Sequence, residues 1–285
     1  MKKIAFIGAT GLLGKPVALA LAKAGYEVTA FVRDPGPARL SFPREIRIFP
    51  GDLRNDGDVR KFLTGHDKVY LNLSVKQDEK KTDWHTESNG LKSLLPIARE
   101  VGIKRIFYLS SLIQRYEASK WWVFEIKRDA INLVRSSGIP STIFYPSTFM
   151  EAITTQYMQG KRLLIAGKSK HKQHFIAVAD YAAQVVKAVE TNTGGDKDYV
   201  IQGPEGYLTN EALEIFKQNY SKSKLSISSA PVSVIRFAGM FNRKMNYGGN
   251  IIEALNNYPE KFEAEQTWTD LGKPQVTLKD FASNV

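Results

Sequence analysis

The sequence predicts an α/β protein built on a doubly wound parallel sheet. Short apolar runs alternate with helical segments over the first 150 residues, and the first run, 4–7, is followed directly by closely spaced glycines. The 285-residue chain contains no cysteine, so neither disulfides nor thiolate-bound metals support the fold. Strands separated by helices form parallel βαβ units, and right-handed crossovers then place helices on both faces of one sheet.

Each element of this alternation has a local signal. Glycines close two of the helices, at Gly25 and Gly102, as helix-ending residues commonly do. Apolar runs predict strands at 4–7, 27–32, 46–49, 68–73, 105–109 and 142–145. Helical spacing of apolar residues predicts helices at 16–24, 56–63, 83–101 and 120–136.

The alternation loosens after about residue 150. Helices are expected at 178–190 and 209–220 around a strand at 199–201, and irregular, largely helical structure is expected over 221–262. We therefore expect a core over 1–150 and a small, mostly helical region over 151–285. The second region is interleaved with the core without a clean boundary and covers the carboxyl ends of the strands, where ligands bind in such sheets.

Composition and charge indicate which binding partners are expected. The chain has 40 Lys and Arg against 29 Asp and Glu, a net charge of +11, but no zinc, helix-turn-helix or RNA-binding signature accompanies these charges, so nucleic acid is not expected. No apolar run approaches the roughly 20 residues that span a bilayer. The first residues resemble a strand rather than a signal sequence, so we expect a cytoplasmic protein with no membrane partner. His171 and His174 lack an acidic neighbour, and no metal site is expected.

The strongest motif is the glycine-rich stretch Gly8-Ala9-Thr10-Gly11-Leu12-Leu13-Gly14. It joins the first strand to the first helix with the spacing G-x-x-G-x-x-G. Gly8 permits the tight turn, Gly11 allows a pyrophosphate close to the backbone, and Gly14 allows the helix to pack closely on the sheet. The free N–H groups of the helix start would bind the phosphates. The motif predicts a dinucleotide-binding Rossmann core over 1–150.

The end of the second strand bears on the choice of dinucleotide. In NAD-binding proteins an acidic residue there binds the ribose 2′-hydroxyl, whereas an arginine accommodates a 2′-phosphate. Here the strand ends in Arg33-Asp34, and Lys15 adds a positive charge beside the glycines. We favour NADP(H) over NAD(H), with Asp34 as the residue that would bind NAD(H) instead.

With these residues in place, most of the chain resembles the extended and atypical short-chain dehydrogenase/reductase superfamily, and within it the NmrA-like branch. Further stretches carry the resemblance: Gly51-Asp52-Leu53, Leu71-Asn72-Leu73-Ser74, Asn89, the serine pair that ends 106–111, the stretch 137–150 and the stretch 176–182. The resemblance implies that Asp52 contacts the adenine and that a lysine binds the nicotinamide ribose. The cofactor residues it implies are Gly8, Thr10, Gly11, Leu12, Leu13, Gly14, Arg33, Asp52, Leu53, Leu73, Ser74 and Lys127.

The resemblance leaves two registers open for the catalytic helix. Short-chain reductases place a tyrosine four residues before the lysine, whose charge lowers the tyrosine pKa for proton transfer. Counting back from Ser137 places the family lysine at Lys127, with Val123 instead of the tyrosine, as in many NmrA-like members. The alternative pair, Tyr116 and Lys120, has the literal spacing but lies close behind Ser111. We favour Lys127.

These residues predict an NADP(H)-dependent oxidoreductase that transfers hydride to a small carbonyl or quinone-like substrate. Ser110 or Ser111 would orient that substrate, and Tyr116 is the less favoured acid. Two alternatives stay open: a non-catalytic regulator that senses NADP(H), and an epimerase or dehydratase acting on a nucleotide sugar. Trp121 and Trp122 would then either line an aromatic pocket or serve in packing, and either a monomer or a homodimer is compatible with the sequence.

Overall fold

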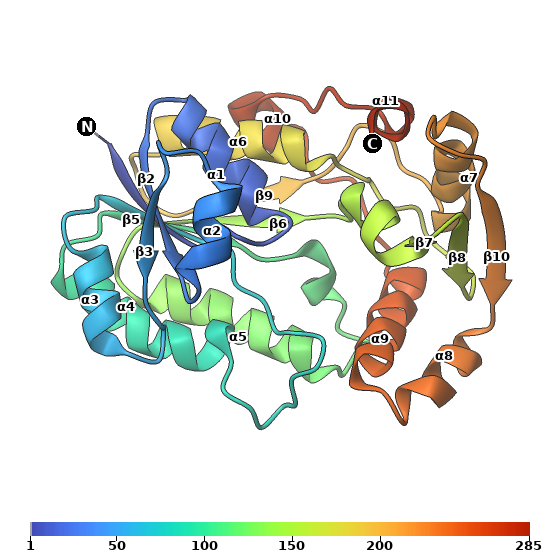
Figure 1. Ribbon diagram of the computed structural model, residues 1–285, viewed down its shortest axis with the longest axis horizontal. Coiled ribbons are helices and arrows are strands. Elements are labelled where there is room, and N and C mark those ends of the chain that lie inside the picture. The colour runs from blue at the N-terminus through green and yellow to red at the C-terminus, as the bar shows by residue number, and fades with distance from the viewer. Residues whose placement is uncertain (1) are drawn as a thin grey trace.

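A seven-stranded parallel sheet forms the centre of the computed structural model, which describes residues 2–285 (Figure 1). The strand order is β3-β2-β1-β4-β5-β6-β9. The strands are β1 (Lys3–Ile7), β2 (Glu27–Val32), β3 (Arg47–Pro50), β4 (Lys68–Leu71), β5 (Arg105–Leu109), β6 (Ser141–Pro146) and β9 (Lys197–Ile201). This order and the flanking helices confirm the predicted doubly wound α/β fold.

Both faces of the sheet are buried, which explains why its strands are almost continuously apolar. Alternate residues of β1 show the division: Ile4 and Phe6 pack on one face, and Ala5 and Ile7 on the other. One face is covered by α1 (Gly14–Lys23), α2 (Pro35–Ser41), α6 (Val178–Thr191) and α10 (Glu265–Leu271). The other is covered by α3 (Asp56–Leu63), α4 (Leu91–Glu100) and α5 (Trp122–Ser136).

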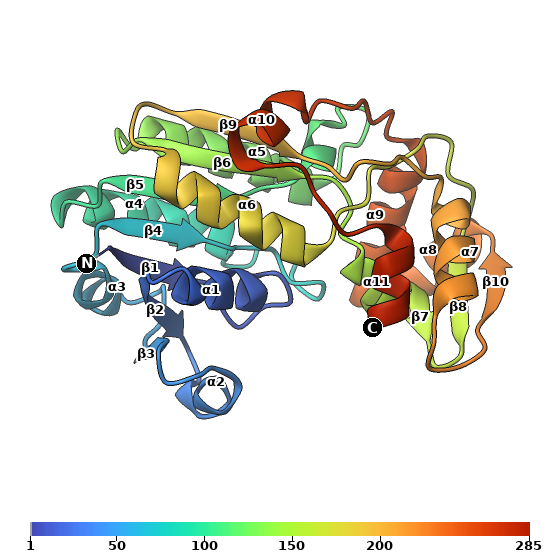
Figure 2. The same cartoon turned by 90° about the horizontal axis from the view of Figure 1, so that it is seen from above.

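The rest of the chain forms a lid region beyond the carboxyl ends of the strands (Figures 1 and 2). It contains a three-stranded sheet of order β10-β8-β7 and its own hydrophobic cluster. Its elements are β7 (Met158–Gln159), β8 (Arg162–Ala166), α7 (Thr209–Asn219), β10 (Ser226–Ala230), α8 (Val232–Gly239), α9 (Arg243–Asn257) and α11 (Leu278–Asn284). Strand β9 and helices α6 and α10 return from this half of the chain to the main sheet.

The structure differs from the sequence prediction at several elements. The small sheet was not predicted, since the serine-rich strand β10 lacks an apolar run. Helix α2 was also missed, although Asp34 caps it by accepting a hydrogen bond from the Gly36 N–H at 3.0 Å. The helix expected at 83–101 begins later, with a π-helical turn η1 (Thr86–Gly90) that continues into α4. Two further short turns are η2 (Leu112–Arg115) and η3 (Ile153–Tyr157).

Across residues 2–285, every helix is too short or too polar to cross a bilayer.

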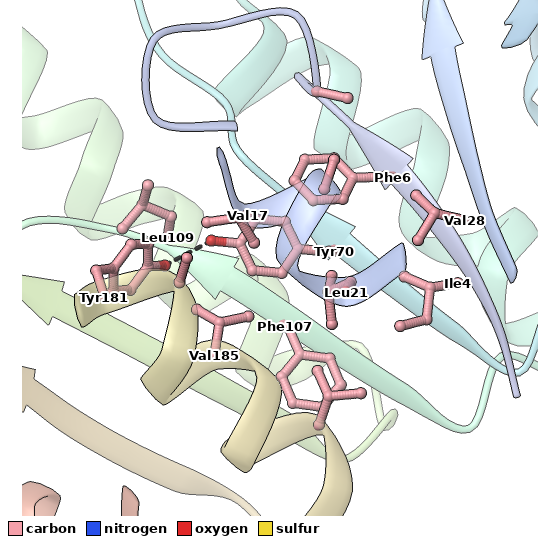
Figure 3. Packing of buried hydrophobic residues seen from close by; sticks show 14 of the residues in the cluster. Ile4, Phe6, Val17, Leu21, Val28, Tyr70, Phe107, Leu109, Tyr181 and Val185 are labelled. Atoms are coloured by element: carbon pink, nitrogen blue, oxygen red, sulfur yellow. Dashed lines mark hydrogen bonds between the residues drawn. The ribbon is translucent and has the colours of Figure 1, made fainter. Parts of the chain in front are cut away.

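A pair of buried tyrosines joins the sheet to its covering helix. The hydroxyls of Tyr70 on β4 and Tyr181 on α6 are 2.5 Å apart, and both side chains are fully buried (Figure 3). Burial raises the pKa of both phenols, so each stays protonated and one donates to the other.

We expect Tyr181→Phe to lower the free energy of unfolding by about 1–3 kcal/mol, because it leaves the Tyr70 hydroxyl buried without a partner. The double variant Tyr70→Phe/Tyr181→Phe should cost less than the two single variants together, because neither hydroxyl then remains. Urea denaturation of the four proteins measures this coupling. Strictly additive effects would contradict it.

Candidate functional site

The glycine-rich loop lies where the strand order reverses. Strands β2 and β3 extend to one side of β1, while β4 and the later strands extend to the other, so the carboxyl ends of β1 and β4 flank a crevice. Gly8 follows β1 and Asn72 follows β4. The Asn72 Nδ2 donates a hydrogen bond to the Gly8 carbonyl oxygen at 3.2 Å, which ties the two strand ends together.

The three glycines of the motif serve different purposes. Gly8 has a φ of +84°, and a Cβ there would lie 2.0 Å from the Asn72 carbonyl oxygen. A Cβ on Gly14 would lie 2.1 Å from the Gly8 carbonyl oxygen. Gly11 is different, because its nearest neighbour would be 3.4 Å away. The packing of the protein therefore requires glycine at positions 8 and 14. Gly11 is not required by packing, and its lack of a side chain leaves space for a ligand.

The start of α1 offers backbone donors to an anion. No side chain caps this helix, and its first turn contains no acidic residue. Among the described residues, the N–H groups of Leu12 and Leu13 have no acceptor. Unsatisfied N–H groups and the positive end of the helix dipole together favour a phosphate. This geometry fits the pyrophosphate of a dinucleotide.

Arg33 and Asp34 have different surroundings at the end of β2. Asp34 is engaged as the cap of α2. Arg33 is exposed and forms no salt bridge with any residue in 2–285. Its guanidinium is therefore available to a ligand, while one carboxylate oxygen of Asp34 is already used. This arrangement fits a 2′-phosphate better than a bare ribose hydroxyl.

The remaining residues expected at the cofactor lie along the same edge. The Asp52 Oδ1 accepts a hydrogen bond from the Arg54 N–H at 2.9 Å, which fixes the turn after β3. Leu53 and Leu73 are buried, and Ser74 is exposed in the segment after β4. These turns place Asp52 next to β2 and Ser74 beyond β4, on opposite sides of the glycine loop.

A cleft separates the glycine loop from the lid region. It is lined mostly by apolar side chains from the loop, from the segments after β5 and β6, and from α9. Its residues are Leu12, Leu13, Ser111, Leu112, Ile113, Pro146, Ser147, Thr148, Phe149, Ala152, Gln156, Ile251, Leu255, Tyr258 and Glu260. The core and the lid therefore both contribute to one hollow beside the expected nucleotide edge, which is the usual position of a ligand pocket.

Ser110 and Ser111 follow β5, and Ser111 lines this cleft. Ser110 is buried, and the hydroxyl oxygens of both serines lack a hydrogen-bond partner among the described residues. Buried polar groups are normally paired, because an unpaired one costs free energy. The unpaired Ser111 hydroxyl at the cleft is suited to a ligand oxygen.

Lys127 is fixed by a buried carboxylate. Its Nζ lies 2.8 Å from the Oε1 of Glu87, and the Tyr108 hydroxyl donates to the same oxygen at 2.8 Å. Glu87 is completely buried, and its second oxygen has no partner among residues 2–285. Burial and the Glu87 charge raise the pKa of Tyr108 well above its usual value, so this phenol remains a donor.

Glu87 is a residue that the sequence analysis missed. A signal for it was present, because Glu87, Leu91, Leu94 and Ala98 fall on one face of a continuous helix. The last three are buried, so the periodicity puts a carboxylate on an apolar face. A charge in that position requires a partner, and Lys127 supplies it.

The alternative pair Tyr116 and Lys120 does not share a helix face. Both residues precede α5, in the loop that follows η2, and Lys120 is exposed. They line a second hollow with Trp121 and Trp122, apart from the cleft. Val123 is buried on α5, four residues before Lys127. The helical geometry of a tyrosine and lysine pair is therefore absent from both registers within the described chain.

A second, partly buried acid lies at the lid end of the cleft. Glu260 accepts hydrogen bonds from the Ser147 hydroxyl at 2.8 Å, the Gln202 amide at 2.7 Å and the His174 N–H at 3.1 Å. Burial raises the pKa of its carboxyl group. The sequence analysis also missed Glu260, because its partners come from separate segments of the chain.

We expect Lys127→Met to lower the free energy of unfolding by about 3–5 kcal/mol, because it leaves the Glu87 carboxylate buried without a counter-charge. Adding Glu87→Gln to this variant should restore part of the loss. The matched control is Lys120→Met, at the exposed lysine, which should change stability by less than about 0.5 kcal/mol. Urea denaturation distinguishes them, and equal effects of the two lysine changes would refute the structural role of Lys127.

Comparison with known proteins agrees with this geometry. The photosystem II assembly factor Ycf39 of Trieres chinensis is 20% identical over 254 residues, covering 87% of this chain and 78% of that protein. A solved nucleoside-diphosphate-sugar epimerase of Staphylococcus aureus has a TM-score of 0.77 at 18% identity and covers all of both chains. NADPH-dependent quinone oxidoreductase QOR2 of Escherichia coli, complexed with NADPH, has a TM-score of 0.74 at 21% identity over 98% of each chain.

These structural likenesses extend to the whole fold, the lid region included. A model of the NmrA-like family matches residues 1–274, which include the glycine loop, the Glu87–Lys127 pair and the cleft. The chain therefore belongs to the NmrA-like family.

Proposed function

We propose that this protein is an NADP(H)-dependent reductase that transfers hydride to a small carbonyl or quinone-like acceptor. The observation that carries the proposal is the shared wall of the cleft. Leu12 and Leu13 of the glycine loop line the same hollow as Ser111 and the lid residues. A nucleotide on the loop and an acceptor in the cleft would therefore be neighbours, which hydride transfer requires.

Different residues at the carboxyl ends of the strands would bind different parts of the cofactor. The N–H groups at the start of α1 would bind the pyrophosphate, and Gly11 would allow it to approach the backbone. Arg33 would pair with the 2′-phosphate, and Asp52 and Leu53 would contact the adenine. Leu73, Ser74 and Lys127 would lie along the nicotinamide half, with Glu87 positioning the lysine.

The cofactor, when bound, supplies the hydride. Of the two candidate serines, Ser111 lines the cleft and would donate a hydrogen bond to the oxygen of the acceptor as negative charge develops on it. The apolar lining of the cleft, with Phe149, Leu255 and Tyr258, would exclude water. Val123 transfers no proton, so the site favours acceptors whose reduced form delocalises charge, such as quinones and conjugated carbonyls.

A regulator that binds NADP(H) without turnover is the second candidate. The observation that favours it is Val123, which occupies the position of the catalytic tyrosine and is buried. The Ycf39 relative of Trieres chinensis is named an assembly factor rather than a reductase, which supports this candidate. The epimerase alternative has less support, because Tyr116 and Lys120 lie in a loop outside the cleft.

We expect Arg33→Ala to weaken NADPH binding about tenfold to a hundredfold and to leave NADH binding nearly unchanged, because a charged hydrogen bond to the 2′-phosphate is lost. The control is Arg39→Ala, at an exposed arginine on the helix α2 that follows Arg33. Fluorescence titration with both nucleotides measures the effect. An equal loss for NADPH and NADH, or no loss for either, would argue against a 2′-phosphate site at Arg33.

Turnover is tested by adding quinones and simple carbonyls to the NADPH complex and following the loss of NADPH absorbance. We expect oxidation with at least one quinone, and Ser111→Ala should lower kcat about a hundredfold by removing a donor to the developing charge. Ser136→Ala, at the end of α5, is the control. Tight binding without oxidation would favour the regulator, and failure to bind either nucleotide would refute both functions.

A further inference from the structure

Exposed apolar side chains are concentrated in one short part of the lid region. Val234, Phe237, Met240, Phe241 and Met245 are all at least 40% exposed, and they make up most of the large exposed apolar residues of the described chain. They lie on α8, on the turn that leads into α9, and, for Met245, in the first turn of α9. We refer to these five residues as the α8 surface.

The packing of α8 explains why this surface faces outward. One side of the helix lies close against α9, where a Cβ on Gly239 would be 2.9 Å from the Asn246 Cα. Ile235 points the same way, because its Cγ2 lies 3.4 Å from the position of a Cβ on Gly249. The outward side of α8 carries the exposed side chains of Val234 and Phe237, and Arg236 is the one charged residue of this helix.

Phe237 and Phe241 project rather than line a groove. They are 65% and 80% exposed, and their rings meet edge to face with centroids 5.7 Å apart. Figure 1 shows α8 at an outer corner of the molecule, beyond α9 and β10. Two projecting aromatic rings can insert into an apolar layer, whereas binding a peptide would require a groove.

The surroundings of this surface are strongly basic. Residues 214–253 contain six Lys and Arg and two Glu, and the two Glu pair with Lys217 and Arg236, which leaves an excess of four positive charges. Arg236, Arg243 and Lys244 lie among the apolar residues. The acidic groups nearby are few: Glu253 forms an ion pair with Arg236, and the Asp78 segment accepts a hydrogen bond from Arg243 through its backbone oxygen at 3.4 Å.

We propose that the α8 surface binds the surface of an anionic lipid bilayer. Apolar side chains that project within a basic field match the chemistry of the interface, where acyl chains lie beneath negatively charged headgroups. A second copy of the same surface is disfavoured, because it would bring Arg243 and Lys244 close to their own counterparts. The chemistry therefore selects an anionic partner that accepts aromatic side chains into an apolar layer.

This proposal is compatible with the absence of a membrane-spanning segment in residues 2–285. The expectation of no membrane partner came from the lack of a long apolar run, but binding at the interface needs only a short apolar face. The proposal does not rest on the proposed reductase function. Helix α9 connects the α8 surface with the cleft, because it packs on α8 and contributes Ile251 and Leu255 to the cleft.

Vesicle sedimentation with the full-length protein tests the proposal. We expect the protein to sediment with vesicles of phosphatidylcholine and phosphatidylglycerol, to remain in solution with phosphatidylcholine alone, and to be released by salt. Phe237→Ser/Phe241→Ser should weaken the partition at least about tenfold, and Arg243→Gln/Lys244→Gln should weaken it about tenfold at low salt. Leu40→Ser, at a 91% exposed leucine on α2, is the matched control and should change nothing.

Circular dichroism and urea denaturation should show all variants folded, because the substituted side chains are exposed. Equal partition of Phe237→Ser/Phe241→Ser and the unmodified protein would overturn the proposal, and so would failure to bind anionic vesicles. Sedimentation velocity tests the alternative that a second copy of this chain covers the α8 surface, because it measures whether the protein is a dimer. A dimer that is lost in Phe237→Ser/Phe241→Ser, without vesicle binding, would assign the surface to a second copy, and capture by an acidic peptide alone would assign it to a protein.

Discussion

The close approach of two strand ends is the constraint on which the site depends. The Gly8 carbonyl lies between Asn72 of the β4 end and Gly14 of helix α1, at distances that exclude a side chain at either glycine. This contact brings the start of α1 to the point where the sheet order reverses. The uncapped N–H groups of the helix therefore open toward the crevice rather than into the protein. The position of any bound phosphate follows from this backbone packing.

The cleft extends this arrangement across the two halves of the chain. Its floor comes from segments after β5 and β6, and its far wall comes from α9 and the residues that follow. Glu260 holds this wall in place, because its carboxylate receives hydrogen bonds from Ser147, His174 and Gln202. These partners belong to both the core and the lid. A network of this kind ties the two regions together and leaves the hollow between them intact.

In the proposed reductase, the buried pair of Glu87 and Lys127 is the main difference from a tyrosine-dependent reductase. The lysine is not presented to a neighbouring tyrosine on its own helix, because Val123 is there. Instead its charge is matched by a carboxylate from η1, which Tyr108 also supports. An ion pair in this position orients the lysine and reduces its ability to activate a phenol. The chemistry that remains is electrostatic and geometric, which agrees with acceptors that need little acid catalysis.

Local signals in the sequence were sufficient for the layered core. Alternating apolar runs and helices predicted six strands of the main sheet and the strand at 199–201, because strands buried on both faces are apolar throughout. The glycine spacing predicted the loop, since only glycine fits at Gly8 and Gly14. The small sheet of the lid escaped prediction, because serine-rich β10 pairs with a strand more than 60 residues earlier and has little apolar pattern of its own.

The sequence by itself determined the fold class, the nucleotide-binding loop and the family, because these depend on spacing within short segments. Tertiary structure pairs Lys127 with Glu87, a carboxylate 40 residues away in the chain, and leaves Lys120 exposed. It also decided that Asp34 caps α2 and leaves Arg33 available. Partners of charged groups are set by packing between distant segments, and no local pattern specifies which segments meet.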